Sequence, residues 1–137
     1  MPRNDAYHQV VKQALLKDGW QVTRDHLSIK YGGLHVQIDL AAERQLNNLP
    51  DQKAAIEVKV FEGISFVNNF EKAVGQYSVY RFLLKKARMD RQLFLAITEA
   101  VYNKFFILPA VREYVTEQEI FLLIFDPKHE EVIAWIK

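Results

Sequence analysis

The sequence predicts an α/β (α+β) domain in which helices flank a mixed β-sheet, with the element order α-βββ-α-β-(αα)-ββ. Three observations predict this class. Residues 5–20 carry apolar side chains at helical spacing, several short runs alternate or are continuously apolar, and residues 66–90 form a long helical pattern between these runs. Strands followed by a long helix and a further strand are typical of a mixed sheet packed against helices.

The composition indicates one globular domain over residues 1–137. Half of the residues are hydrophobic, 26% are charged, and the net charge is +1. The absence of cysteine excludes disulfides and thiolate metal sites and favours a cytoplasmic location. No apolar run is long enough for a membrane span and no signal peptide is recognisable, so we expect no membrane association. Any attraction to nucleic acid must come from local charge.

The first half of the chain predicts one helix and three strands. The helix within residues 5–20 has an amphipathic stripe. Residues 20–43 alternate on both sides of Gly32-Gly33, which is typical of a two-stranded hairpin. A third strand follows at 54–61, after a cluster of turn-forming residues.

The second half predicts the long helix, two short helices and three strands. These elements are a helix at 66–90, a strand at 92–98, short helices at 99–107 and 109–115, and closing strands at 119–126 and 131–137. The closing strands are unusually hydrophobic for the periphery of a small domain. One edge could therefore bury against a partner subunit, and a homo-oligomer is one such arrangement.

The strands at 35–40 and 56–60 each place an acidic residue among apolar ones. Side chains alternate between the two faces of a strand, so Asp39, Glu57 and Lys59 share one face if these strands are neighbours. The expected apolar face consists of Val36, Ile38, Leu40, Ile56, Val58 and Val60. The three polar side chains then meet on the opposite side of the sheet.

The convergence of two carboxylates predicts a cation site. Carboxylates within a few ångströms repel each other, and burying them is costly unless a cation compensates the charge. Mg²⁺ or Mn²⁺ prefers such oxygen ligands, here Asp39 and Glu57, and Lys59 could orient an attacking water or steady a phosphate. These are the parts of a phosphodiester-cleaving site. A solvated sheet face with a cross-strand Glu–Lys pair explains the same alternation, and spacing alone leaves both interpretations open.

Three further residues are weighed for this site. Gln76 follows Gly75 inside the long helix, where a glycine costs about 1 kcal/mol and suggests a close approach, so Gln76 could contact a phosphate or orient Lys59. The alternative is a solvated glutamine. His8 could be a third metal ligand, although imidazole is less typical of Mg²⁺, or it could be a partly exposed packing residue. Glu43 could reach the same cation, but pairing with a basic neighbour is favoured.

Three basic residues of the long helix could contact DNA. Arg81, Lys85 and Arg88 follow one another at helical spacing. Neutralising backbone phosphates would make their binding dependent on salt. A solvated helix face explains the same pattern.

The arrangement resembles the PD-(D/E)xK nuclease superfamily, which has the restriction-endonuclease-like fold. In that superfamily an acid ends the second strand, Glu-x-Lys lies on the third, and a helix follows; Asp39, Glu57 and Lys59 match these positions. Isoleucine precedes Asp39 where the pattern often has proline. The resemblance implies a metal-dependent endodeoxyribonuclease. It also places His8 near a metal-binding glutamate of resolvase-like members, and Gln76 where several nucleases have a phosphate contact.

A second resemblance, to the XisH family of fdxN-element excision controlling factors, covers nearly the whole chain. The matching blocks are YHQVVKQALLKDGW, IKYGGLHVQIDLAAE, AAIEVKVF, AVGQYSVYR, FFILP and DPKHEEVIAWI. This resemblance implies a cyanobacterial protein that controls excision of a DNA element together with a small partner protein, XisI. It leaves the biochemical step open.

Three functions are compatible with these observations. The first is a DNA endonuclease that depends on Mg²⁺ or Mn²⁺. The second is a non-catalytic accessory factor that binds DNA or a partner protein and assists a separate site-specific recombinase. The third is one component of a two-component system of the restriction or toxin type.

Overall fold

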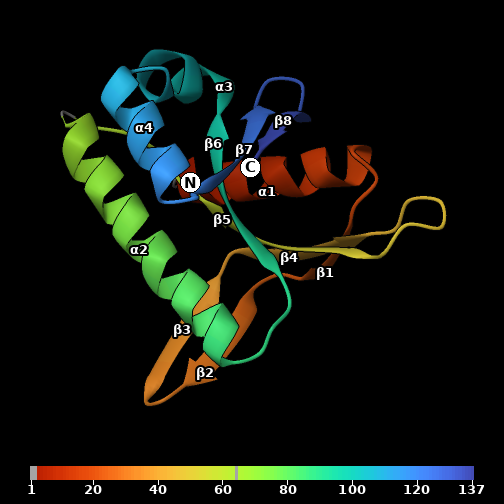
Figure 1. The fold of residues 1–137 in the computed structure, drawn as a ribbon. Coiled ribbons are helices and arrows are strands. Elements are labelled where there is room, and N and C mark those ends of the chain that lie inside the picture. The colour runs from red at the N-terminus through yellow and green to blue at the C-terminus, as the bar shows by residue number, and fades with distance from the viewer. Residues whose placement is uncertain (1–2, 64) are drawn as a thin grey trace.

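Helices cover both faces of a central β-sheet in the computed structural model, which describes residues 3–63 and 65–137 (Figure 1). The strands are β1 (Gln21–Arg24), β2 (Leu27–Tyr31), β3 (Leu34–Ile38), β4 (Leu40–Arg44), β5 (Gln52–Val58), β6 (Gln92–Thr98), β7 (Phe121–Asp126) and β8 (Glu131–Ile136). The helical elements are α1 (Arg3–Lys17), α2 (Phe66–Lys86), α3 (Glu99–Val101), the π-helical turn η1 (Tyr102–Phe106) and α4 (Pro109–Glu117).

The central sheet is mixed. Its six strands follow the order β1-β4-β5-β6-β7-β8, whereas β2 and β3 form a separate two-stranded sheet. β5, β6 and β7 are parallel neighbours, and the other neighbouring strands are antiparallel. Parallel neighbours need a long connection, and α2 provides it between β5 and β6. The predicted mixed α+β class is therefore confirmed.

α1 and α2 pack on opposite faces of this sheet (Figure 1). On the α1 face the buried cluster includes Val11, Leu15, Leu40, Ile56, Val58, Phe94 and Phe125. On the α2 face it includes Ala55, Ala73, Tyr77, Leu84, Leu95, Ile97 and Ile124. Because Ile56 and Val58 both face α1, strand alternation turns the intervening Glu57 toward the α2 side.

The segment 20–43 forms four strands rather than the predicted two. The Gly32-Gly33 turn is present between β2 and β3, and both glycines have positive φ values, 56° and 93°. The chain bends on either side of this hairpin, at residues 25–26 before β2 and at Asp39 after β3. As a result, β1 and β4 pair in the central sheet, while β2 and β3 leave it as an arm. The predicted element order is wrong at this point.

The bend at Asp39 also changes which side chains share a face. Ile38 belongs to the buried cluster on the α2 side, whereas Leu40 belongs to the cluster on the α1 side. Val36 packs against the same cluster as Ile38. The expectation that Val36, Ile38 and Leu40 share one face is therefore wrong for Leu40, because the strand does not continue through Asp39.

α2 begins at a side-chain cap and ends earlier than predicted. The Asn68 N–H donates to Ser65 Oγ at 3.1 Å, which satisfies one of the open N–H groups of the first turn. The helix ends at Lys86 instead of residue 90, and Arg88 has a φ of 56°, the left-handed conformation that follows many helices. Across the described residues, no helix combines the length and apolar character needed to cross a bilayer.

The closing strands occupy different positions in the sheet. β7 lies between β6 and β8, and its residues 122–125 are buried. β8 is an edge strand, with the Ile133 side chain 46% exposed. Of the two closing strands, β8 is therefore the one placed to pair with a partner strand, because both sides of β7 are already paired.

A buried hydroxyl ties α2 to the sheet. Tyr77 Oη donates to the Leu93 carbonyl at 2.8 Å and accepts the Phe121 N–H at 3.1 Å. These two backbone groups lie where the parallel strands β6 and β7 begin. A buried backbone group that loses its partner costs about 1–3 kcal/mol.

Tyr77→Phe is expected to lower the free energy of unfolding by about 1–3 kcal/mol, because it removes both hydrogen bonds and keeps the ring. Urea denaturation followed by circular dichroism measures this change. Tyr114→Phe is the matched control, since Tyr114 is 40% exposed and its hydroxyl bonds to no described residue. The control is expected to shift stability by less than about 0.5 kcal/mol. Equal effects of the two substitutions would contradict the role of Tyr77.

Candidate active site

The candidate site begins at Asp39, where the chain passes from β3 of the arm into β4 of the central sheet. The register of β4 with β5 ends at Leu40 and Ile56. Beyond it, the Asp39 N–H donates to Glu57 Oε1 at 3.1 Å, and the Val58 N–H donates to Asp39 Oδ2 at 2.8 Å. Because a buried N–H without an acceptor is costly, these two bonds stabilise the break in the sheet. They also hold the two carboxylates close together at the carboxyl end of β5.

Glu57 carries the buried carboxyl of the site and is only 7% exposed. Burial, followed by the nearby Asp39 charge, raises the pKa of Glu57 to about 8, against the opposing effect of the Lys59 ammonium. Without a bound cation, this carboxyl is therefore mostly protonated at neutral pH. A divalent cation beside it would favour the ionised form.

Lys59 completes the group predicted from strand alternation. Its Nζ lies 3.6 Å from Glu57 Oε2, and its side chain is 26% exposed. The Lys59 backbone N–H donates to the Ala96 carbonyl at 3.0 Å, which extends the pairing of β5 with β6 by one residue. The structure thus brings Asp39, Glu57 and Lys59 together at one end of β5.

His8 approaches this group from α1. Its Nδ1 lies 3.9 Å from Asp39 Oδ1, and its Nε2 is 2.7 Å from Asp25 Oδ1. Lys12, on the next turn of α1, donates to Asp25 Oδ2 at 2.7 Å. The hydrogen bonds from Lys12 and then His8 lower the pKa of Asp25, despite the opposing effect of burial. Asp25 is therefore a charged acceptor that fixes the orientation of the His8 ring.

Sequence reasoning missed Asp25 and His26. Both lie at the bend between β1 and β2, whereas a continuous hairpin over 20–43 would make them ordinary mid-strand residues. His8, His26 and Asp39 each offer one ligand atom, and these atoms lie within 4.8 Å of one another. The signal in the sequence is the run Arg-Asp-His at 24–26, which interrupts the alternation of the hairpin.

Tyr80 on α2 lies close to the carboxylates, and Gln76 lies one helical turn before it. Gln76 Nε2 donates to Tyr80 Oη at 2.7 Å, while the buried Gln76 Oε1 has no partner among the described residues. Burial and then the charge of Glu57 raise the pKa of Tyr80, because the ring lies close to the acidic pair. The close approach expected at Gly75 is wrong, since a Cβ there would meet nothing within 4 Å.

The predicted basic residues do not form one stripe. The Arg81 guanidinium donates to the Gln118 and Glu119 carbonyls at 3.0 and 2.8 Å, which closes the end of α4. Lys85 is exposed on α2, and Arg88 lies beyond the end of that helix. Arg81 and Lys85 line a shallow surface near the start of β6, whereas the acidic pair lies at the carboxyl end of the parallel neighbour β5.

Glu43 lies apart from the site. Its partner in the register of β4 with β5 is Lys53, and Glu43 Oε1 lies 4.0 Å from Lys53 Nζ and 3.8 Å from Arg91 Nη2. The favoured pairing of Glu43 with a basic neighbour is confirmed. This second Glu–Lys pair has the same residue types as Glu57 and Lys59 but lies at the other end of β5.

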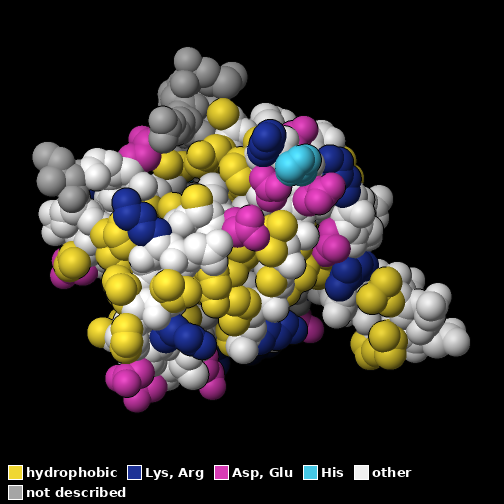
Figure 2. All heavy atoms as spheres, turned by 90° about the horizontal axis from the view of Figure 1, so that it is seen from above, with side chains coloured by type: hydrophobic (Ala, Val, Ile, Leu, Met, Phe, Trp, Pro, Cys, Tyr) yellow, Lys and Arg dark blue, Asp and Glu magenta, His cyan; other side chains and the backbone are white. Residues whose placement is uncertain are grey.

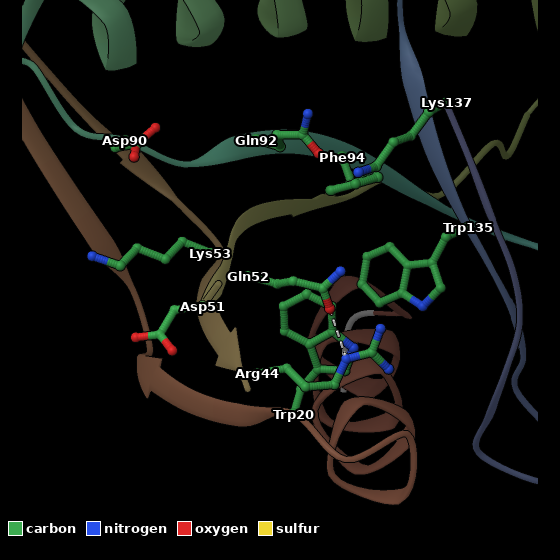
Figure 3. Close-up of a pocket in the computed structure, with 10 residues that line it drawn as sticks. All are labelled: Trp20, Arg44, Asp51, Gln52, Lys53, Asp90, Gln92, Phe94, Trp135 and Lys137. Atoms are coloured by element: carbon green, nitrogen blue, oxygen red, sulfur yellow. Dashed lines mark hydrogen bonds between the residues drawn. The ribbon is translucent and has the colours of Figure 1, made fainter. Parts of the chain in front are cut away.

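A pocket of about 390 Å³ also lies at the amino-terminal end of β5 and β6 (Figure 3). Several polar groups of its wall are already paired. Arg44 Nε donates to Gln52 Oε1 at 3.0 Å, and the indole N–H groups of Trp20 and Trp135 both donate to Asp18. We place the candidate chemistry at the acidic group instead, because burial there raises the pKa of a carboxyl that lies beside a second acid and a lysine.

The side chains at the acidic group fit a divalent cation. Asp39 and Glu57 supply the carboxylate oxygens that Mg²⁺ and Mn²⁺ prefer. The Asp39 side chain is 26% exposed, so an ion and its waters have access from solvent. A cation would also offset the cost of ionising the buried Glu57.

The metal-free protein is expected to lose stability relative to Glu57→Gln as pH rises from 4.5 to about 8. The unfolded chain releases the Glu57 proton near pH 4.5, whereas the folded protein keeps it until about pH 8. Between these pH values a rise in pH favours the unfolded chain, so the free energy of unfolding falls, and it levels off once Glu57 has ionised in the folded protein. The slope of the difference is at most about 1.4 kcal/mol per pH unit. Urea denaturation with a chelator at pH 5–9 measures the difference. The exposed Glu113→Gln variant should give a flat difference, and a flat curve for Glu57→Gln would contradict the assignment.

The chain is similar to known proteins over nearly its whole length. The XisH family model matches residues 1–133. The chain is similar to the crystal structure of a protein from Anabaena variabilis described as an fdxN element excision controlling factor, with 41% identity, a TM-score of 0.89, and coverage of 97% of this chain and 99% of that chain. An XisH family protein from Nostoc punctiforme shares 40% identity and a TM-score of 0.88, with coverage of 97% and 100%. No functionally curated protein matches the chain. The chain belongs to the XisH family.

Proposed function

We propose that this chain is a controlling factor for excision of a DNA element and acts as a metal-dependent endonuclease with a restriction-endonuclease-like fold. The description of the Anabaena variabilis relative, which is 41% identical, supports the role in excision. The order of chemical groups supports the nuclease. Asp39 directly precedes β4, Glu57 and Lys59 lie at the end of the next strand, and α2 follows.

The observation that carries the proposal is the meeting of Asp39, Glu57 and Lys59 at one end of β5. The alternative was a solvated Glu–Lys pair, which leaves its glutamate in water. Glu57 instead is 7% exposed and has a pKa raised to about 8, while Glu43 and Lys53 form the solvated pair. A strongly perturbed carboxyl beside a second acid and a lysine is typical of functional sites.

The residues of this site suit the hydrolysis of a phosphodiester. Mg²⁺ or Mn²⁺, held by Asp39 and Glu57 with His8 nearby, would supply Lewis-acid polarisation of the phosphate and a more acidic water. Lys59 places an ammonium where it stabilises negative charge developing on a phosphate oxygen. Gln76, anchored by Tyr80, offers an amide at the edge of the site for orienting the phosphate. Addition of water would then break one P–O bond and leave a phosphate end and a hydroxyl end.

DNA cleavage in the presence of Mg²⁺ or Mn²⁺ is the expected activity. Asp39→Asn, Glu57→Gln and Lys59→Met are each expected to lower the rate by at least about 100-fold, because the first two remove a carboxylate that would hold the metal and the third removes the ammonium that would offset negative charge developing on the phosphate. Gel assays on supercoiled, linear and branched DNA measure the rate.

Glu43→Gln and Lys53→Met are the matched controls, since they change the same residue types at the other end of β5. Both are expected to retain the rate of the unchanged protein. Cleavage that survives Asp39→Asn and Glu57→Gln would contradict the assignment of the active site.

An exposed apolar surface favours a second candidate function, that of a non-catalytic accessory factor. Large hydrophobic side chains are exposed at the start of α2 and around α4, namely Val67, Ile107, Leu108 and Tyr114. Hydrophobic side chains extend across the middle of the face seen from above the view of Figure 1 (Figure 2). Such surfaces commonly bind proteins, and we propose an XisI-like partner or a site-specific recombinase here. Excision that persists in the Asp39 and Glu57 variants would favour this candidate over the nuclease.

Lys85 and Arg88 are the proposed phosphate contacts. The Arg81 guanidinium already bonds to two backbone carbonyls through Nη1, so a contact of Arg81 with a phosphate would have to use its remaining N–H groups. Lys85 and Arg88 are both exposed.

The double variant Lys85→Gln/Arg88→Gln is expected to weaken DNA binding uniformly across sequences, because phosphates carry no sequence information. The slope of log affinity against log salt should fall by about 2, one for each lost contact. Fluorescence anisotropy at several salt concentrations measures both effects. The exposed Lys104→Gln variant on η1 is the charge control. An unchanged salt slope in the double variant would identify this part of α2 as an ordinary solvated surface.

A further inference from the structure

We propose that His8, His26 and Asp39 form a binding site for a first-row transition metal ion such as Co²⁺ or Zn²⁺, in preference to Mg²⁺. These residues converge from three places in the chain: α1, the bend between β1 and β2, and the junction of β3 with β4. The site shares Asp39 with the proposed nuclease centre. It goes beyond that centre in its ligands and its metal, and it does not require that the chain cleave DNA.

The three ligand atoms are close enough for one ion. They lie within 4.8 Å of one another, and metal–nitrogen and metal–oxygen bonds of such ions are about 2.0–2.2 Å long. Small side-chain rotations therefore close them around a common centre. Three protein ligands also leave at least one position for water or a further ligand.

The orientation of His8 is already fixed for metal binding. Asp25 Oδ1 lies 2.7 Å from His8 Nε2, and Lys12 holds the other oxygen of Asp25 at 2.7 Å. A carboxylate accepts and cannot donate, so the proton of the neutral His8 ring lies on Nε2 and the lone pair on Nδ1. Nδ1 is the atom that lies 3.9 Å from Asp39 Oδ1. Histidine ligands of metals are commonly held by a carboxylate on the outer nitrogen in this way.

His26 completes the site from the solvent side. Its ring centroid is 5.3 Å from that of His8, with the two planes tilted by 33°. The His26 side chain is 52% exposed, which gives an incoming ion access and lets the ring adjust. Asp39 uses Oδ2 for the Val58 N–H, so Oδ1 remains directed toward the histidines.

The ligand set determines which metal is favoured. Imidazole nitrogen suits Zn²⁺, Cu²⁺, Fe²⁺ and Ni²⁺, whereas Mg²⁺ selects carboxylate, carbonyl and water oxygens. Two imidazoles and one carboxylate therefore favour a transition metal ion. The carboxylates of Asp39 and Glu57, by contrast, suit Mg²⁺ or Mn²⁺. The two overlapping ligand sets thus differ in metal preference.

Cobalt titration of the untagged 137-residue chain tests the proposal, because the visible absorption of Co²⁺ reports its ligands without any enzymatic assay. One equivalent of Co²⁺ is expected to bind, Zn²⁺ to displace it, and Mg²⁺ in large excess to leave it bound. His8→Ala and His26→Ala are expected to raise the dissociation constant by more than about 100-fold. Asp25→Asn should raise it about 10–100-fold, the usual effect of losing the partner of a histidine ligand.

The chain carries its own controls, since it has four histidines. His35 bonds to Ser28 and His129 bonds to Asp126, so His35→Ala and His129→Ala are expected to leave Co²⁺ affinity unchanged. His26→Ala is the decisive variant, because its exposed side chain can be removed without opening the core, and circular dichroism checks its fold.

Three results would overturn the proposal: no Co²⁺ binding by the unchanged chain, unaltered affinity in His26→Ala, or displacement of Co²⁺ by equimolar Mg²⁺. Failure of the nuclease proposal is distinguishable from these results. Binding of Co²⁺ through His26 without DNA cleavage would remove the nuclease alone. Cleavage with Mg²⁺ but without Co²⁺ binding would remove the transition-metal site alone.

Discussion

Two reciprocal hydrogen bonds between Asp39 and the end of β5 fix the geometry on which the rest of the site depends. One runs from the Asp39 N–H to Glu57 and the other from the Val58 N–H to Asp39. They replace the backbone ladder between β4 and β5, which stops at Leu40 next to the junction with β3. Because side chains satisfy these backbone groups, the chain can change direction there without leaving buried N–H groups unpaired. The structural solution to a break in the sheet therefore also places two acids together.

The sequence was sufficient to predict the acidic group because alternation within short strands depends on local geometry. Glu57 and Lys59 share a face for that reason, and Asp39 meets them although the strand bends at its own position. The run Arg-Asp-His at 24–26 marks an interruption of the hairpin, but the place of Asp25 and His26 beside His8 could not be predicted from it, since only the departure of the β2–β3 arm turns them toward α1. That departure is a tertiary event without a glycine or proline at the bend.

Other differences between expectation and structure have similar causes. Ala87 and Arg88 are acceptable helix residues, so local sequence does not mark the end of α2, and the connection to β6 decides it. The continuous apolar run of β7 does indicate an interior strand, because strands that are buried on both faces are apolar along their whole length. In the structure β7 lies between β6 and β8. The more alternating β8 is the edge strand. The argument from Gly75 failed because a glycine within a helix indicates close packing only when a neighbour is present.

The β2–β3 arm has a practical consequence that follows from its connectivity. It departs from and returns to a pair of hydrogen-bonded strands, β1 and β4, so the central sheet closes behind it. Leu27, Ile29 and Ile38 secure its base, whereas its tip, Tyr31 to Leu34, is exposed on all four residues. A fluorophore or affinity sequence introduced between Gly32 and Gly33 would therefore lie at the exposed tip of the β2–β3 arm, away from the central sheet. Such a reporter could follow assembly on nucleic acid or protein while Asp25, His26 and Asp39 at the base of the arm stay unchanged.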